Sequence, residues 1–163
     1  MDSEDFDKHI AVEFFDSVKR VIQDIPCVLG NSRDELEIKL DRKYLLKIAG
    51  LLKDDSNTDM KYLRSLSIVD WIEDMEAVYH LSSVNHSNRI VIKIRVPMDE
   101  LLLDSVIPVW KGADWHEREA NDLFGVRFRG HPNMAPLILY DGFEGFPGRK
   151  SYELAEQDTF YGD

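Results

Sequence analysis

The residues best suited to metal chemistry lie close together in the stretch WHEREANDLFGVRFRGHP, residues 115–132. A zinc-protease helix needs two histidines at i and i+4, with a glutamate directly after the first. Here His116 is followed by Glu117, but Ala120 stands where the second histidine is required. His116 and Glu119 have the i, i+3 spacing of di-iron carboxylate bundles in reversed order, and a second ligand set is not evident. A metal site is therefore the less favoured interpretation of this stretch.

Nucleophilic and nucleotide chemistry find little support elsewhere in the sequence. The single cysteine, Cys27, follows Pro26 in an apolar stretch, where a buried and unreactive thiol is expected. One cysteine can form neither a disulfide within the chain nor an all-cysteine iron–sulfur cluster, and it fits a reducing compartment. The sequence contains no G-x-S-x-G nucleophile motif, no P-loop and no G-x-G-x-x-G motif. Nucleophilic catalysis and nucleotide binding are therefore the less favoured interpretations of this chain.

Wound as a helix, residues 112–124 separate into two faces, and Gly125 is suited to a left-handed C-terminal cap. The side expected to pack on the domain carries Ala113, His116, Ala120, Leu123 and Phe124. The opposite side carries Trp115, Arg118, Glu119 and Asp122. Arg118 and Asp122 could pair along the helix, but an exposed pair contributes only about 0.3–0.5 kcal/mol. Tryptophan among arginine and acids is typical of the centre of a protein interface. The alternative is an ordinary amphipathic helix with one exposed tryptophan.

The segment after this helix is expected to leave the domain along a fixed path. Residues 126–129 alternate as a short strand, facing inward at Val126 and Phe128 and outward at Arg127 and Arg129. Gly130 can adopt backbone angles that other residues avoid, and His131 is held extended because Pro132 follows it. His131 could relay protons, since histidine titrates near neutrality, but a structural hydrogen bond is the favoured interpretation.

The elements that must position this stretch follow from hydrophobic periodicity. Spacings of three or four predict helices at residues 5–25, 41–53, 99–107 and 112–124. Alternation predicts strands at 35–40, 63–73, 76–83 and 89–96. Turns are expected at Gly30-Asn31-Ser32, Asp74-Met75 and 85–88, and Asp41 is expected to cap the second helix.

This order predicts an α+β fold in which helices cover an antiparallel sheet meander. Residues 1–130 are expected to form a single domain. Beyond residue 130 glycine and proline are frequent, so residues 131–163 are expected to form an extended tail that binds a partner.

Composition restricts the partners. The net charge of −11 argues against direct binding to nucleic acid or anionic lipid, both of which attract clustered lysine and arginine. The acidic N-terminal residues lack the apolar segment of a secretory signal, and no stretch approaches the length of a membrane span. We therefore expect contact with a membrane only through a partner protein.

The stretch also resembles a known family signature. Glu117-Arg118-Glu119, Asp122-Leu123-Phe124-Gly125-Val126, Phe128 and Gly130-His131-Pro132 are similar to the signature of the 30 kDa subunit of respiratory complex I, the C subunit of bacterial NADH:quinone oxidoreductase. The resemblance extends roughly from residue 60 to residue 154. Its further matches are Tyr79-His80-Leu81, Ala113-Asp114-Trp115, Ile138-Leu139, Gly145, Pro147, Arg149-Lys150 and Tyr152.

The resemblance implies a non-catalytic, cofactor-free subunit in the peripheral arm of a proton-pumping oxidoreductase, on the cytoplasmic side of the cell membrane. Its partners would be the hydrogenase-like large subunit and adjacent iron–sulfur subunits. Those partners would hold the iron–sulfur clusters and a flavin or deazaflavin module that pass electrons from NADH or another donor to a quinone-type acceptor. The expected interface residues are Trp115, Glu117, Arg118, Glu119, Asp122, Arg127, Arg129, His131, Pro132, Arg149, Lys150 and Tyr152.

Two departures from the family pattern leave alternatives open. Met134-Ala135-Pro136-Leu137 replaces a segment that usually contains an arginine pair, and Gly148 and Ser151 change the usual Leu-Arg-Lys-Asp-Tyr sequence. The chain could therefore belong to a reduced-deazaflavin dehydrogenase or a membrane-bound hydrogenase complex. The third interpretation is a stand-alone metal-dependent enzyme that uses His116, Glu119 or His131.

Overall fold

The computed structural model describes residues 12–33 and 35–153. The first helix, α1 (Val12–Val21), buries Phe14 and Val18, as the spacing predicts. Residues 5–11, where this helix was expected to begin, lie outside the described residues. The predicted end at residue 25 is wrong: residues 22–25 form a turn in which the Ile25 N–H donates to the Ile22 carbonyl at 2.8 Å. Pro26 explains this early end, because a proline disfavours helical angles in the residue before it.

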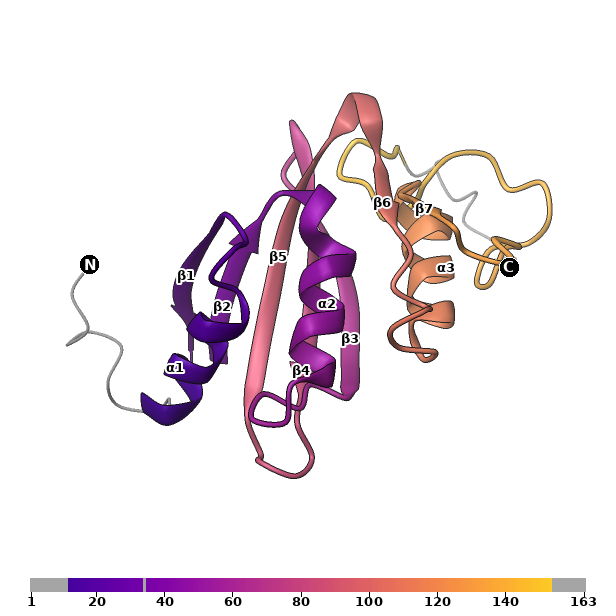
Figure 1. Ribbon diagram of the computed structural model, residues 1–163. Helices are drawn as coiled ribbons and strands as arrows, with labels where there is room; N and C mark the ends of the chain where they lie inside the picture. Colours follow the sequence, from indigo (N-terminus) through magenta and orange to yellow (C-terminus); the bar gives the residue numbers. More distant parts are fainter. Residues whose placement is uncertain (1–11, 34, 154–163) are drawn as a thin grey trace, which may run out of the picture.

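Five strands form one sheet in the order β1–β2–β5–β4–β3 (Figure 1). They are β1 (Cys27–Ser32), β2 (Glu35–Leu40), β3 (Tyr62–Asp70), β4 (Asp74–Ser82) and β5 (Arg89–Pro97). The predicted antiparallel meander β3–β4–β5 is confirmed. β2 runs parallel to β5, and β1 pairs antiparallel with β2 at the edge.

Two predicted turns are wrong. Gly30-Asn31-Ser32 belongs to β1, where Gly30 lies opposite Glu37, and the chain leaves the strand at Arg33, whose φ is 58°. Asp74-Met75 opens β4, and the reversal occurs at residues 71–73. In both places pairing with a neighbouring strand overrides the local turn preference of glycine, asparagine and aspartate.

The core lies on one face of the sheet. Alternate sheet residues that are fully buried there include Leu36, Ile38, Tyr79, Leu81, Ile90, Ile92 and Ile94. The helix α2 (Leu45–Asp54) lies along this sheet in Figure 1 and buries Leu45, Ile48, Ala49 and Leu52 in the same core. A short 3-10 turn (Arg42–Tyr44) precedes α2, and the Asp41 side chain accepts the Lys43 N–H at 2.9 Å, as the predicted cap.

The predicted helix at residues 99–107 is wrong. A 3-10 turn (Met98–Glu100) is followed by the strand β6 (Leu102–Asp104), which pairs in parallel with β7 (Arg127–Arg129). This pairing joins segments that are far apart along the chain, so no local periodicity reveals it. Between them lies the helix α3 (Ala113–Phe124), which is confirmed with its Gly125 cap. No helix in the described ranges is long and apolar enough to cross a bilayer.

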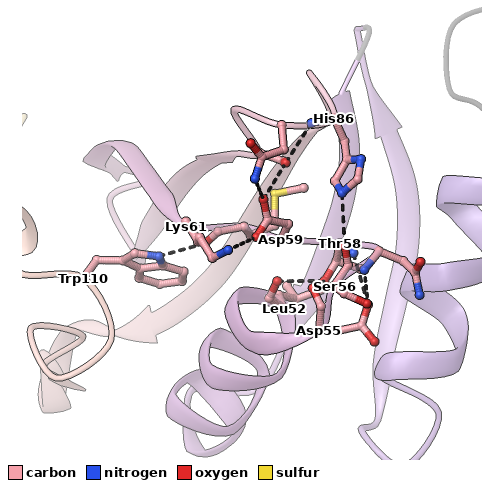
Figure 2. A network of polar contacts seen from close by, with 12 residues as sticks. Leu52, Asp55, Ser56, Thr58, Asp59, Lys61, His86 and Trp110 are labelled. Carbon is pink, nitrogen blue, oxygen red and sulfur yellow. Dashed lines mark hydrogen bonds and ion pairs between the residues drawn. The ribbon is translucent and has the colours of Figure 1, made fainter.

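A network of polar contacts surrounds the connection between α2 and β3, and Trp110 of the loop before α3 is attached to it (Figure 2). Asp59, buried and with a φ of 48°, accepts the Asn85 amide at 2.7 Å and the Ser83 hydroxyl at 3.3 Å, and it pairs with Lys61. The buried Trp110 indole N–H donates to the carbonyl of Met60 at 2.9 Å. The chain before α3 is thereby attached to the start of β3, and α3 itself packs against β3.

Candidate partner-binding surface around α3

The buried side of α3 is centred on an acid. Ala113 and Ala120 are buried, as predicted, but so is Glu117, whose side chain is 0% exposed. His116, Leu123 and Phe124, which were also expected on this side, are only half-buried. Glu117, which was predicted to contact a partner, is enclosed by its own chain in this structure. The two alanines leave room beside the glutamate, and a hydrogen bond from the preceding loop satisfies one of its two oxygens.

Glu117 is a buried carboxyl group with only one oxygen well satisfied. Its Oε1 accepts the backbone N–H of Val106 at 2.7 Å, and the Ser105 hydroxyl also contacts the carboxylate. Its Oε2 has no hydrogen-bond partner among the described residues, and His131 Nε2 lies 4.0 Å from it. Burial raises the pKa of Glu117 to about 7, because the charged form loses its hydration. The buried Tyr79 hydroxyl also has no hydrogen-bond partner among the described residues. Its pKa is raised, mainly by burial and to a smaller extent by the Glu117 charge.

His131 ties the start of the tail to the first turn of α3. Its side chain is 0% exposed, so it too is enclosed rather than presented to a partner. The Asn133 N–H donates to Nδ1 at 3.0 Å, which leaves Nε2 as the ring donor of the neutral imidazole. Nε2 lies 3.3 Å from the carboxylate and 3.4 Å from the backbone carbonyl of Asp114. The imidazole therefore joins two segments separated by 17 residues.

Asp122 and Arg118 hold the next part of the tail. Asp122 Oδ2 accepts three consecutive backbone N–H groups, those of residues 137, 138 and 139, at 3.1, 2.7 and 2.9 Å. Burial alone would raise the pKa of Asp122, but these three donors and the Arg118 charge lower it. Arg118 donates to the carbonyls of Ala135 and Pro136, each at 3.0 Å. The charges expected to pair with each other or with a partner thus bind the backbone of the same chain.

The C-terminal end of α3 is closed by the tail. Arg149 Nε donates to the Phe124 carbonyl at 2.8 Å, and its guanidinium lies 4.3 Å from the centre of the Phe146 ring. A cation at this end also suits the helix dipole. Gly125 has a φ of 74°, and a Cβ there would lie 2.5 Å from Arg149 Nη2. Both the backbone and the packing therefore require glycine at this position.

The last described part of the tail returns to the sheet. The Lys150 N–H donates to Asp70 Oδ2 at 2.8 Å, at the end of β3. The Tyr152 ring stacks on Phe143 with 6.2 Å between centroids, and a Cβ at Gly145 would lie 2.8 Å from Tyr152. Asp70 was missed from the sequence, because its partner lies 80 residues further along the chain.

The surface left for another molecule carries large exposed apolar side chains among charged ones. Trp115 is 65% exposed, and in the tail Ile138 and Tyr140 are 54% and 72% exposed. Of the other predicted interface residues, Arg127 and Pro132 are exposed and Glu119 is half-buried. Arg129 pairs with Asp104 at 2.6 Å on the exposed edge of the β6–β7 pair.

The polar side chains of this region mainly hold segments of the chain together. Among residues 12–33 and 35–153, no group of three histidine, cysteine, aspartate or glutamate side chains lies close enough to hold a metal ion. The charged side chains of the stretch contact backbone groups, and the tail they hold lies beside α3 in Figure 1. The tail was expected to lie along another protein, but its described part, residues 131–153, packs first on its own domain.

The family model described as the respiratory-chain NADH dehydrogenase, 30 Kd subunit, matches residues 38–158. The chain belongs to this family. The C subunit of NADH-quinone oxidoreductase from Nocardioides sp. is 36% identical over 126 residues, which cover 75% of this chain and 50% of that protein. A C subunit of the same oxidoreductase from Rhizobium etli is 39% identical over 113 residues, covering 68% and 60%. The chain thus spans about half to three fifths of the length of these curated relatives.

Solved structures share the fold of this family member. A chain of the membrane-bound sulfane sulfur reductase, an archaeal respiratory membrane complex, has a TM-score of 0.75 at 24% identity, covering 86% of this chain and 85% of that one. A trypsin-resistant fragment of Nqo5 has a TM-score of 0.58 at 23% identity, covering 72% and 98%. In the present chain, the signature residues Glu117, Arg118, Asp122 and Gly125 hold a loop and the tail against α3.

Proposed function

We propose that this chain is a non-catalytic, cofactor-free subunit in the peripheral arm of a complex I-like, proton-pumping oxidoreductase. In this proposal it holds the hydrogenase-like large subunit in place, beside adjacent iron–sulfur subunits, on the cytoplasmic side of the membrane. Iron–sulfur clusters and a flavin or deazaflavin module in those partners would carry electrons from NADH or another donor to a quinone-type acceptor.

One observation carries the scaffold role. The signature charges that could do chemistry are engaged by backbone groups of this chain: Asp122 holds three N–H groups, Arg118 two carbonyls and Glu117 one N–H. What they hold together is α3, which exposes Trp115, and the tail, which exposes Ile138 and Tyr140. Large aromatic side chains at such a surface are the residues that dominate binding energy at protein interfaces.

The outer surface of α3 and the tail is the proposed contact with the large subunit. Removing the indole with Trp115→Ala should lower the amount of this chain that remains with the complex by roughly tenfold or more, because an interface tryptophan commonly contributes at least ~2 kcal/mol. The matched control is Val28→Ala: Val28 is 66% exposed but lies on β1, at the opposite edge of the sheet from β3 and α3. The measurement is subunit stoichiometry in complexes purified from native membranes, together with quinone reduction.

The proposal fails if Trp115→Ala leaves both stoichiometry and quinone reduction at the level of Val28→Ala. Mass spectrometry of the subunits that co-purify with the unaltered chain identifies the electron-input module. An NADH-oxidising module supports the first form of the proposal, whereas a deazaflavin or hydrogenase module supports the related complexes. A chain that purifies alone with a tightly bound metal would favour a stand-alone enzyme.

A further inference from the structure

The face of the sheet opposite the core is rich in charge. Because side chains alternate along a strand, the residues between the buried ones point away from α2 and the core. They include Glu35, Glu37 and Lys39 on β2, His80 on β4, and Lys93 on β5. The long side chains stay accessible, since those of Lys39 and Arg89 are 55% and 58% exposed. A polar sheet face is often simply hydrated, so the balance of charge on it decides what it can bind.

Glu35 is shared by three basic side chains. Arg64 Nη1 and Arg89 Nη1 lie 2.6 and 4.0 Å from Oε1, and His80 Nδ1 lies 2.9 Å from Oε2. Burial would raise the pKa of Glu35, but the hydrogen bonds and charges of His80 and Arg64 lower it. The carboxylate is therefore ionised at neutral pH and neutralises at most one of the arginines around it.

A second carboxylate on this face is shared in the same way. Glu37 is 7% exposed and pairs with Lys39 at 2.8 Å and with Lys93. Burial raises the pKa of Glu37, and hydrogen bonds from both lysines more than offset this. Glu35 and Glu37 thus each pair with two permanently charged cations, whereas Arg95 on the same face is matched by Glu76 and Asp74. In a chain with a net charge of −11, the group around Glu35 and Glu37 is a local excess of positive charge.

The residues around Glu35, together with Lys93, line a hollow of about 550 Å³ near the β1–β2 turn. Its walls carry Arg33, Glu35, Arg64, His80, Arg89 and Lys93. Val78 and Val91, which are 7% and 1% exposed, lie among them. Arg64 and Arg89 contact the same carboxylate oxygen, so their charges lie well within the Debye length of ~8 Å at physiological ionic strength and repel each other. An anionic group in the hollow would relieve that repulsion.

We propose that this basic hollow binds an acidic segment of a neighbouring polypeptide. Two structural features favour a polypeptide over a small anion. The lining cations extend beyond the group around Glu35, with Arg33 in the β1–β2 turn and Lys93 on β5, so a segment with several carboxylates can reach more of them than a small anion can. The planar guanidinium groups of the arginines can each bind a glutamate carboxylate of such a segment in two-point fashion.

The hollow lies on the face opposite the core and is separate from the surface proposed above for the large subunit. Peptide binding to the hollow can therefore be measured on the full chain alone, and its outcome is independent of the Trp115→Ala result in the complex. The probe is a synthetic hexaglutamate peptide, titrated into isotopically labelled chain at about 10 mM ionic strength, where the Debye length reaches ~30 Å. We expect amide shifts at Glu35 and Arg89, and weaker binding at physiological ionic strength.

The decisive variant is the pair Arg64→Gln and Arg89→Gln, which should weaken peptide binding by tenfold or more. The matched control is Arg20→Gln. Arg20 lies on α1, outside the hollow, where it is 57% exposed and pairs with Asp55 at 3.5 Å. It should leave binding within about twofold, because only long-range charge is lost. If the double variant does not fold, Arg33→Asn serves instead, since asparagine tolerates the positive φ of an exposed turn residue.

Three results would overturn the inference. The first is a peptide that leaves the amides of the hollow unchanged. The second is equal loss of binding in Arg20→Gln and in the hollow variants, which would mean attraction to the chain's cations in general. The third is displacement of the peptide by an equal concentration of inorganic phosphate, which would make the hollow a small-anion site.

Discussion

At the scale of single residues, Glu117 shows how a local pattern can conceal burial. Its spacing of four from Ala113 and three from Ala120 places it on their side of the helix, but a carboxylate is not expected to face a core. The N–H of Val106, eleven residues earlier, makes the burial possible, and Asp114 raises its pKa further once burial has done so. Solvation and a non-local donor decide this position, and neither is visible in helical spacing.

The raised pKa of Glu117 gives stability a definite dependence on pH. The pKa is about 7 in the folded chain and 4.5 for an unperturbed glutamate, so the folded state binds the proton more tightly. The resulting stabilisation is complete below about pH 4.5 and is lost as the pH rises through about 7, on the order of 3 kcal/mol in total. Asp114, His131 and Tyr79 face the same site and are present in both the parent chain and Glu117→Gln. We therefore expect Glu117→Gln to become more stable relative to the parent chain as the pH rises from about 4.5 to about 7. Denaturant unfolding at several pH values measures this difference. A difference that is independent of pH would contradict the assignment.

Two glycines that flank α3 should respond oppositely to a methyl group. Gly125→Ala should cost at least ~1–2 kcal/mol, because it forces a left-handed backbone onto alanine and drives its Cβ toward Arg149 and Phe146. Gly112 has a φ of −65° and nothing within 4 Å of an added Cβ, so Gly112→Ala should stay within ~0.5 kcal/mol of the parent. Thermal unfolding of the two variants makes the comparison, and equal destabilisation would mean that the cap does not hold the tail.

At the scale of elements, the prediction from sequence succeeded where the signal is local. The alternation in β5 and the spacing in α3 each repeat within one element, so their positions follow directly. The strand β6 was mistaken for a helix because three leucines in a row fit either conformation. Its pairing with β7, which is distant along the chain, decides in favour of a strand. The same reasoning explains why Arg118 and Asp122 were assigned to a partner: their backbone partners lie 15 to 18 residues away in a tail without helix or strand.

The tail should be released from α3 by a single substitution that leaves the domain folded. Asp122→Ala removes the acceptor of three N–H groups, and hydrogen bonds to a charged group are each worth about 1.5–3 kcal/mol. Amide exchange at residues 137–139 should accelerate by tenfold or more, while exchange in β4 and β5 stays unchanged. Glu119→Ala is the control, because Glu119 is a half-buried acid on the same helix without a role in holding these amides. Acceleration in both variants, or in neither, would remove Asp122 from this role.

At the scale of the whole molecule, one core links the sheet to α3 through the loop that carries Trp110. Residues from α1, α2, α3, β7 and one face of the sheet belong to a single buried cluster. The α+β class could be predicted because it depends only on the order of elements. The position of α3 could not, since it depends on the Trp110–Met60 contact and on the Asp59 network, which join segments about 25 to 50 residues apart.

Cooperativity tests whether this linkage governs the fold. Trp110→Phe keeps an aromatic ring in the core but leaves the buried Met60 carbonyl without its indole donor, which should cost about 1–3 kcal/mol. If the sheet and α3 unfold as one unit, amides in β4, β5 and α3 should lose protection by the same factor, and circular dichroism should show one transition at lower temperature. Asp122→Ala provides the contrast, because its effect is expected only in the tail. Selective loss of protection in α3, with β4 and β5 unchanged, would instead make α3 and its tail a separate folding unit joined to the sheet by the loop.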